Sequence, residues 1–151
     1  MLKENKWTYV TLIVALMIIS AVYTIKRIKP FGVNSMLDVD FYHQYGPLLN
    51  ELRNRITENR SLLFSFNTGG GIPFYRNFLN YLSSPFNIIL FLFNKNDIVM
   101  AFSIIIGLKA VMASVSMSYY LRKVFKKTGV FQVIFSLSYA FQDIFVHTTG
   151  I

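Results

Sequence analysis

The sequence has no cysteine and only two histidines among its 151 residues. The absence of cysteine excludes disulfides, thiolate metal sites, a cysteine nucleophile and a lipoprotein anchor. The histidines, His43 and His147, are too few and too far apart in the sequence to suggest a shared metal site. Charged residues make up 15% of the chain, against about 25% in a typical soluble domain. The composition therefore excludes a disulfide-stapled secreted domain and disfavours a soluble one.

Apolar residues make up 54% of the chain and gather in long runs. Residues 7–25 carry no charge and suffice to cross about 30 Å of hydrocarbon as a helix. A cleaved signal peptide is the alternative, but its apolar core is usually about 7–15 residues long and the sequence at Ser20 matches a cleavage site poorly. Further spans are predicted at residues 98–121 and 130–147. The predicted fold class is an all-α integral membrane protein with three transmembrane helices and a long loop at residues 26–97.

The loop at residues 26–97 is predicted to contain interfacial helices, because structureless loops of this length are uncommon. Pro47 can begin a helix that is apolar on one face. The three glycines at positions 69–71, followed by proline at position 73, require a turn. Residues 85–93 are apolar but too short to span, which predicts an interfacial or re-entrant helix. The helix after Pro47 is predicted to place Leu48, Leu49, Leu52 and Ile56 on its apolar face and Glu51, Arg53, Asn54 and Arg55 around the rest.

The basic residues set the predicted orientation. The net charge is +8, but the basic residues flank apolar spans, so contact with anionic membrane lipid is predicted and nucleic acid binding is not. Six of them lie near the N-terminus or between the last two spans, and four lie near the ends of the loop. This majority predicts a multi-pass protein of the cell membrane with a cytoplasmic N-terminus and an external loop, although the cluster at residues 26–29 opposes it. The six are Lys3, Lys6, Arg122, Lys123, Lys126 and Lys127, and the four are Lys26, Arg27, Lys29 and Lys95.

The second predicted span has two unusual features. Small residues line one of its helical faces and predict the close approach of another helix. Lys109, near its middle, is costly in lipid, which predicts a phosphate or carboxylate partner. The alternatives are a lysine that snorkels to the interface or one that pairs with a polar group such as Asp143 of the third span. The small residues are Gly107, Ala110, Ser114 and Ser118.

Two groups of charged residues in the loop could support chemistry. A carboxylate beside a membrane, at Asp38 or Asp40, can act as a general base on a hydroxyl group. The alternatives are two solvated loop acids or an Asp-x-Asp metal–diphosphate site. Four arginines could hold a phosphate by paired hydrogen bonds, or could form a solvated helix face against lipid head groups. The arginines are Arg53, Arg55, Arg60 and Arg76.

A string of motifs resembles the start of the bacterial YfhO membrane-protein family. In chain order the motifs are Asp40-x-x-x-Gln44-Tyr45, Ser61-Leu62-x-x-Ser65-Phe66-x-x-Gly69-x-Gly71-x-x-Phe74 and Tyr81-Leu82-x-Ser84-Pro85-x-Asn87. Lys109 and the run Ser138-Tyr139-Ala140-Phe141 continue the resemblance, which covers nearly the whole chain. Gly70 departs from the bulkier apolar residue that is usual between the two motif glycines.

The resemblance implies a multi-spanning glycosyltransferase of the GT-C type. Such an enzyme takes sugar from a polyprenyl-phosphate carrier on the outer face and passes it to a cell-envelope polymer such as lipoteichoic acid. Asp40 falls at the position of the catalytic carboxylate, with Asp38 as the candidate if the alignment shifts by two residues. No cofactor or metal ligand is assigned, and a metal requirement is left open. The residues expected to bind the substrate or the carrier are Gln44, Tyr45, Arg53, Arg76 and Lys109.

The members of this family are several times longer than this chain. The chain is therefore expected to be the N-terminal membrane region of a larger protein and to be inactive alone. A second function stays open, that of a non-catalytic membrane transport or envelope-assembly component. In that case the motifs form a lipid-docking surface and Lys109 belongs to a transport pathway.

Overall fold

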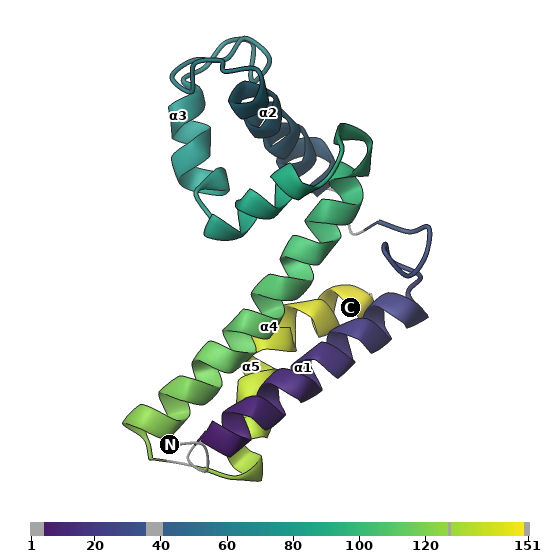
Figure 1. Cartoon of the computed structure of the whole chain (residues 1–151), viewed down its shortest axis with the longest axis vertical. Coiled ribbons are helices and arrows are strands. Elements are labelled where there is room, and N and C mark those ends of the chain that lie inside the picture. The colour runs from purple at the N-terminus through teal and green to yellow at the C-terminus, as the bar shows by residue number, and fades with distance from the viewer. Residues whose placement is uncertain (1–4, 36–40, 127, 150–151) are drawn as a thin grey trace. The chain divides into compact units, whose positions relative to one another are not determined.

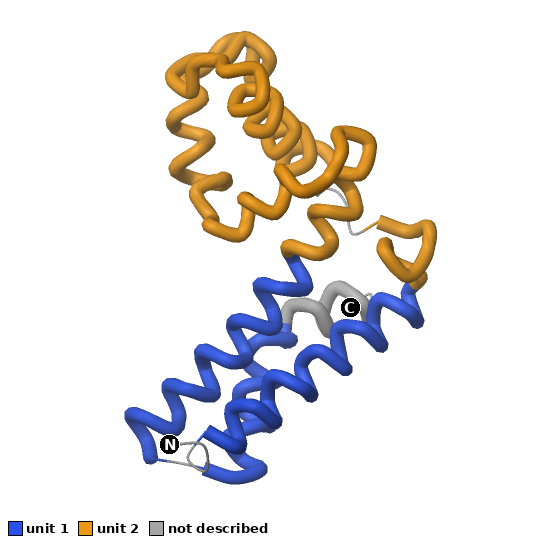
Figure 2. The backbone as a smooth tube through the Cα atoms, viewed as in Figure 1, with its two compact units in different colours: residues 1–26, 106–151 blue, residues 27–105 orange. Residues whose placement is uncertain are grey.

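The computed structural model of the chain describes residues 5–35, 41–126 and 128–149. Within these ranges the regular elements are all helical, apart from two isolated bridges (Figure 1). The chain divides into two compact units, which Figure 2 draws in different colours. Unit 1 comprises residues 1–26 and 106–151, and unit 2 comprises residues 27–105. The all-α prediction is confirmed for the described part of the chain.

Unit 1 contains helix α1 (Lys6–Ile25), most of helix α4 (Ile98–Val124) and helix α5 (Val130–Thr149). Two helical segments are long and apolar enough to cross a membrane, the 20 residues of α1 and the 30 residues of Lys95–Val124. Both coincide with predicted spans. Helix α5 covers the third predicted span, but its described apolar stretch, Val130–Gln142, is shorter than a span requires. The crossing of α5 therefore stays a prediction.

The small face of α4, which carries Gly107, Ala110, Ser114 and Ser118, packs against α1. A Cβ atom added at Gly107 would lie 3.1 Å from Tyr23 Oη and 3.3 Å from Ile19 Cγ1, so a larger side chain needs a shift of these neighbours. Farther along the same face, Ser118 Oγ accepts a hydrogen bond of 3.2 Å from Thr11 Oγ1. The prediction that the small face allows close approach of another helix is confirmed, and α1 is that helix.

A buried amide on α5 links the three helices of unit 1. Gln132 is 1% exposed, and its Nε2 donates to Ser118 Oγ at 2.7 Å and to the Ser118 carbonyl at 3.0 Å. The same nitrogen donates to Thr8 Oγ1 of α1 at 3.3 Å. Hydrogen bonds between membrane helices contribute about 0.6–1.7 kcal/mol each. The amide therefore fixes the register of α5 against both of its neighbours.

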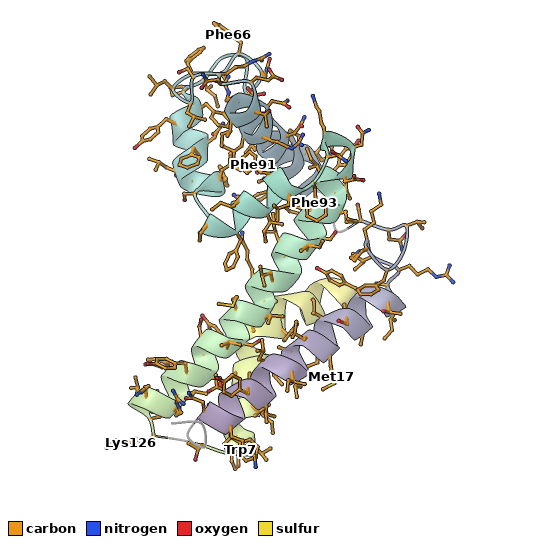
Figure 3. The ribbon with its side chains drawn as sticks, viewed as in Figure 1. Trp7, Met17, Phe66, Phe91, Phe93 and Lys126 are labelled. Carbon is orange, nitrogen blue, oxygen red and sulfur yellow. The ribbon has the colours of Figure 1, made fainter. Side chains whose placement is uncertain are left out.

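The outward faces of α1 and α5 are apolar. Ile13 and Met17 of α1 are exposed, as are Phe131 and Phe135 of α5. Figure 3 shows Met17 pointing away from the neighbouring helices. Because water penalises a continuous apolar face of this kind, these helices suit contact with lipid chains.

Unit 2 is built from short helices around α2. In chain order they are the π-helix η2 (Phe41–Tyr45), α2 (Gly46–Thr57), α3 (Phe74–Asn77), the π-helix η3 (Phe78–Leu82), the 3₁₀-helices η4 (Pro85–Leu92) and η5 (Lys95–Asp97), and the start of α4. Helix α2 packs against η3 and η4. The core of unit 2 includes Leu52, Phe74, Leu82 and Leu90, each of which is at most 2% exposed. Pro47 lies in the first turn of α2, as predicted, because that position needs no amide donor.

Residues 85–92 form a helix too short to cross a membrane, as predicted. Its side chains divide between two environments: Leu90 is buried, whereas Ile88 and Leu92 are 68% and 79% exposed. Asn87 stabilises its start, because Nδ2 donates to the Leu82 carbonyl at 2.7 Å. The placement of this helix at the membrane interface stays a prediction.

Candidate functional site

The charged centre of unit 2 is the carboxylate of Glu51, whose side chain is 8% exposed. Its Oε1 accepts hydrogen bonds from Arg55 Nε at 2.7 Å and from Ser65 Oγ at 2.8 Å. Its Oε2 accepts a hydrogen bond of 3.1 Å from Asn67 Nδ2. Both oxygens are therefore occupied by donors of the chain. A carboxylate held in this way serves as an anchor for the loop rather than as a base for substrate.

These donors keep Glu51 ionised. Burial raises the pKa of its carboxyl group, but hydrogen bonds from Ser65, Asn67 and Arg55, together with the positive charge of Arg55, lower the pKa further than burial raises it. The net pKa lies below the ordinary glutamate value of 4.5. Folding of unit 2 thus favours the charged form of this side chain.

Arg55 carries the second half of the buried ion pair. Its guanidinium carbon lies 5.0 Å from the centre of the Phe74 ring, and its Nη1 donates to the carbonyl of Ser61. Phe74 is fully buried. Glu51 and Arg55 together therefore attach α2 to both ends of the segment that leads to α3.

That segment contains the predicted glycine turn. The amide of Ser65 donates to the Ile72 carbonyl and the amide of Ile72 donates to the Ser65 carbonyl, both at 3.0 Å. The glycines at positions 69, 70 and 71 have φ angles of +57°, +74° and +111°, which glycine adopts without steric cost. The turn prediction is confirmed. Phe66 stands at this turn with 82% of its surface exposed, and Figure 3 shows it at the edge of unit 2.

The predicted catalytic residues, Asp38 and Asp40, lie outside the described residues. The residues that follow them are described. Gln44 is exposed in η2. Tyr45 is half-buried, and its ring meets the ring of Tyr81 edge to face with 5.6 Å between the centres. The motif positions Tyr45 and Tyr81 therefore meet although they lie far apart in the sequence.

The remaining predicted binding residues lie in three separate environments. Arg53 Nη2 donates to the Phe93 carbonyl at 2.7 Å, which ties α2 to the end of η4. Arg76 is exposed on α3. Lys109 is exposed on α4 and belongs to unit 1, whereas the two arginines belong to unit 2. The side chain of Asp143, its suggested partner, lies outside the described part of the structure.

The expected arrangement of the α2 side chains is wrong at three positions. Glu51 and Arg55 were expected on the polar face, yet both are 6% exposed, whereas Ile56 of the expected apolar face is 47% exposed. An ion pair between residues four apart on a helix can be buried on its apolar face when other donors also hydrogen-bond to the carboxylate. Glu51 follows Leu48 by three residues, and Arg55 follows Leu52 by three residues. This spacing places both charged residues beside the apolar residues on the helix, and it is the sequence signal that indicates their burial.

The described residues contain no group of three metal-ligating side chains close enough to hold an ion. The buried polar cluster instead has the character of a scaffold. The motif residues Ser65 and Phe74 belong to that scaffold, and so does the Asn87 amide.

The family model for the bacterial membrane protein YfhO matches residues 11–149. The chain belongs to this family. No match was found among curated proteins or among solved structures. The YfhO match covers both units, so the helices of unit 1 and the motif scaffold of unit 2 are both features of a YfhO protein. Membership of this family makes the chain a bacterial membrane protein.

Proposed function

We propose that this protein takes part in transferring a sugar from a polyprenyl-phosphate carrier to an envelope polymer, such as lipoteichoic acid, on the outer face of the cell membrane. One observation carries the proposal: the structure separates the motif residues into two classes. Ser65, Phe74 and Asn87 are buried and support the fold of unit 2. Gln44 is exposed and has no such role among the contacts of the described residues. Asp40 precedes it by four residues in the sequence.

In the proposed reaction Asp40 is the general base. Its carboxylate takes the proton of an acceptor hydroxyl while the hydroxyl oxygen bonds to the anomeric carbon of the sugar. The bond from that carbon to the carrier phosphate breaks, and the phosphate leaves with the electron pair. Gln44 and Tyr45 are proposed to position the sugar, and either the unit 2 arginines Arg53 and Arg76 or Lys109 of unit 1 to balance charge on the phosphate.

This reaction needs a defined orientation in the membrane. We propose three spans, with α5 as the third, a cytoplasmic N-terminus and an external unit 2. Trp7 and Lys126 lie at the same end of unit 1 (Figure 3), as two spans that run in opposite directions require. The basic residues at this end, which include Lys123 and Arg122, support a cytoplasmic location.

The test compares two substitutions in the protein as the bacterium expresses it. Asp40→Asn keeps the shape of the side chain but removes its basicity, so glycosylation of the envelope polymer should fall by about 10²–10⁴-fold at an unchanged protein level. Asp38→Asn should cost much less. If Asp38→Asn is the damaging change, the base is Asp38. If both variants glycosylate normally, the carboxylate mechanism is wrong and a non-catalytic role in envelope assembly or transport replaces it.

A further inference from the structure

Residues 27–34 follow the cap of helix α1 directly and form a closed loop, the α1 loop. The Asn34 amide donates a hydrogen bond of 2.8 Å to the Arg27 carbonyl, and the Lys29 amide donates one of 2.9 Å to the Asn34 carbonyl. The chain therefore returns at Asn34 to the place that it left at Arg27. Because the loop closes on its own first residue, it cannot carry its side chains far from the end of the helix that it follows.

The shape of the α1 loop is fixed by close backbone contacts. A Cβ atom added at Gly32 would collide with the Arg27 carbonyl oxygen, so a larger residue there would force the loop open. Arg27 has a φ angle of +51°, which a residue other than glycine keeps only when its surroundings hold it there. Ile28 is buried, and its carbonyl accepts a hydrogen bond of 2.8 Å from the Phe31 amide. The loop therefore presents a defined surface.

Two apolar side chains form the exposed part of this surface. Phe31 is 57% exposed and Val33 is 83% exposed. Arg27, at the start of the loop, is exposed as well. Aromatic and long basic side chains are typical of the boundary between lipid chains and head groups, where the apolar part of each residue leaves water and the polar part stays in it. The composition of the exposed surface therefore suits a membrane boundary better than bulk water.

The place of the α1 loop in the chain puts it at such a boundary. Helix α1 has 20 residues and so is about 30 Å long, which equals the hydrocarbon core of a bilayer. Its last residue, Ile25, then lies at the edge of this core, and it is 77% exposed. The head-group layer beyond the core is only about 5–7 Å deep. A loop that starts two residues after Ile25 and closes on itself begins within this layer.

We infer that the α1 loop is a membrane-docking surface, with the side chains of Phe31 and Val33 inserted among the lipids at this end of α1. The contact removes two apolar side chains from water and leaves the Arg27 guanidinium among the head groups. It continues the lipid-facing surface of α1 beyond its last turn and holds that end of the helix at a fixed depth. Phosphate is common to neutral and anionic phospholipids, so the docking needs no anionic lipid. The inference does not rest on the proposed sugar transfer, and it holds for either orientation of α1.

Depth-dependent quenching by brominated lipids tests the inference on the full chain. Trp7 is the only tryptophan, so Trp7→Phe with Phe31→Trp leaves a single fluorophore, in the α1 loop. The protein is reconstituted in phosphatidylcholine vesicles that contain phosphatidylcholine brominated either near the head group or near the end of the acyl chains. The shallow bromines should quench Phe31→Trp more strongly than the deep ones. Met17→Trp is the depth reference: Met17 is exposed near the middle of α1, so the order should be reversed there.

Phe66→Trp in the same background is the matched control. Phe66 is an exposed phenylalanine of the same unit that does not adjoin a span in the sequence, so its quenching should be much weaker. Equal quenching of Phe66→Trp would show a general association of unit 2 with lipid and would overturn the inference. Stronger quenching of Phe31→Trp by the deep bromines would overturn it as well, since the loop would then lie inside the hydrocarbon. A shallow signal from Met17→Trp would remove the span on which the inference depends.

The remaining outcome is the absence of quenching of Phe31→Trp by either lipid, and acrylamide then shows the reason. Quenching by acrylamide would place the α1 loop in water, and protection from acrylamide would show that protein covers it. Both results would overturn the inference. Phe31 is exposed, so its replacement by another aromatic residue should leave the packing of the loop unchanged.

Discussion

Ser65 Oγ donates a hydrogen bond of 2.8 Å to Glu51 Oε1 and thereby joins the glycine turn to helix α2 across fourteen residues of sequence. Ser65 is fully buried and Glu51 is 6% exposed. The hydroxyl also accepts a hydrogen bond of 3.1 Å from the amide of Asn67. One serine therefore links a buried charge, the backbone of the turn and, through its own amide, the bridge to Ile72.

The Ser65 hydroxyl is predicted to hold the turn closed. Ser65→Ala removes a donor to a buried carboxylate, a loss of about 1.5–3 kcal/mol. Amide hydrogen exchange of residues 61–75 should therefore accelerate by about 10–100-fold, because each 1.4 kcal/mol corresponds to about a factor of ten. Exchange measured by mass spectrometry on the full chain in detergent reports this segment separately from the spans.

Ser83→Ala is the matched control. Its hydroxyl donates to the Leu79 carbonyl at 3.2 Å on an exposed surface, so the same atom is deleted without affecting Glu51. Exchange of residues 61–75 should not change in this variant. Equal acceleration in both variants would show that the Ser65 contact adds no specific stability to the turn.

The stability of the turn is also predicted to depend on pH. The pKa of Glu51 is lowered in the folded state, so the unfolded state takes up a proton first as the pH falls. The stabilisation is present above the ordinary pKa of 4.5 and is lost as the pH falls through the lower folded pKa. Protection factors of residues 61–75, corrected for intrinsic exchange, should be constant from about pH 7 to pH 5 and decrease below that range. Glu51→Gln should be less protected at neutral pH and should lack this decrease.

Local patterns in the sequence predict much of the fold, because they arise from local causes. An uncharged run needs no partner to be recognised as a span, and α1 follows the prediction within one residue at its start. The turn at residues 69–71 follows from glycine alone, whose backbone needs no tertiary contact to adopt positive φ. The small face of α4 also follows from a local pattern, since helical periodicity places Gly107 and Ser118 on one side of the helix.

The scaffold of unit 2 could not be predicted in this way. Ser65 and Asn67 contact Glu51 only because the chain reverses direction after α2, and no periodic pattern records that contact. The sequence assigned Glu51 to the polar face because a lone charge is costly to bury. The burial occurs because three donors meet the carboxylate, which is a tertiary effect. The contact between the rings of Tyr45 and Tyr81 is likewise a result of tertiary folding.

Gly107 is predicted to be essential for the contact between α1 and α4. Gly107→Leu introduces a side chain whose first atom would lie 3.1 Å from Tyr23 Oη and 3.3 Å from Ile19 Cγ1. Overpacking of this kind typically costs about 1–3 kcal/mol. Thermal unfolding of the full chain in detergent should therefore occur at a lower temperature. Ser116→Leu, which adds the same bulk at an exposed position of α4, should leave the transition within error of the parent protein; an equal decrease in that variant would contradict the predicted role of this contact.

The orientation of the spans gives the last prediction, and the absence of cysteine makes it direct. Leu63 is 72% exposed in unit 2 and Lys126 is exposed after α4, so each can be replaced by a single cysteine without opening the core. An impermeant maleimide added to intact cells should label Leu63→Cys, whereas Lys126→Cys should be labelled only after lysis. The reason is the excess of basic residues near Lys126, which favours the cytoplasmic side. The reverse pattern would place unit 2 inside the cell and remove the outer-face carrier from reach of Asp40. Labelling of both positions in intact cells would show that α4 does not cross the membrane.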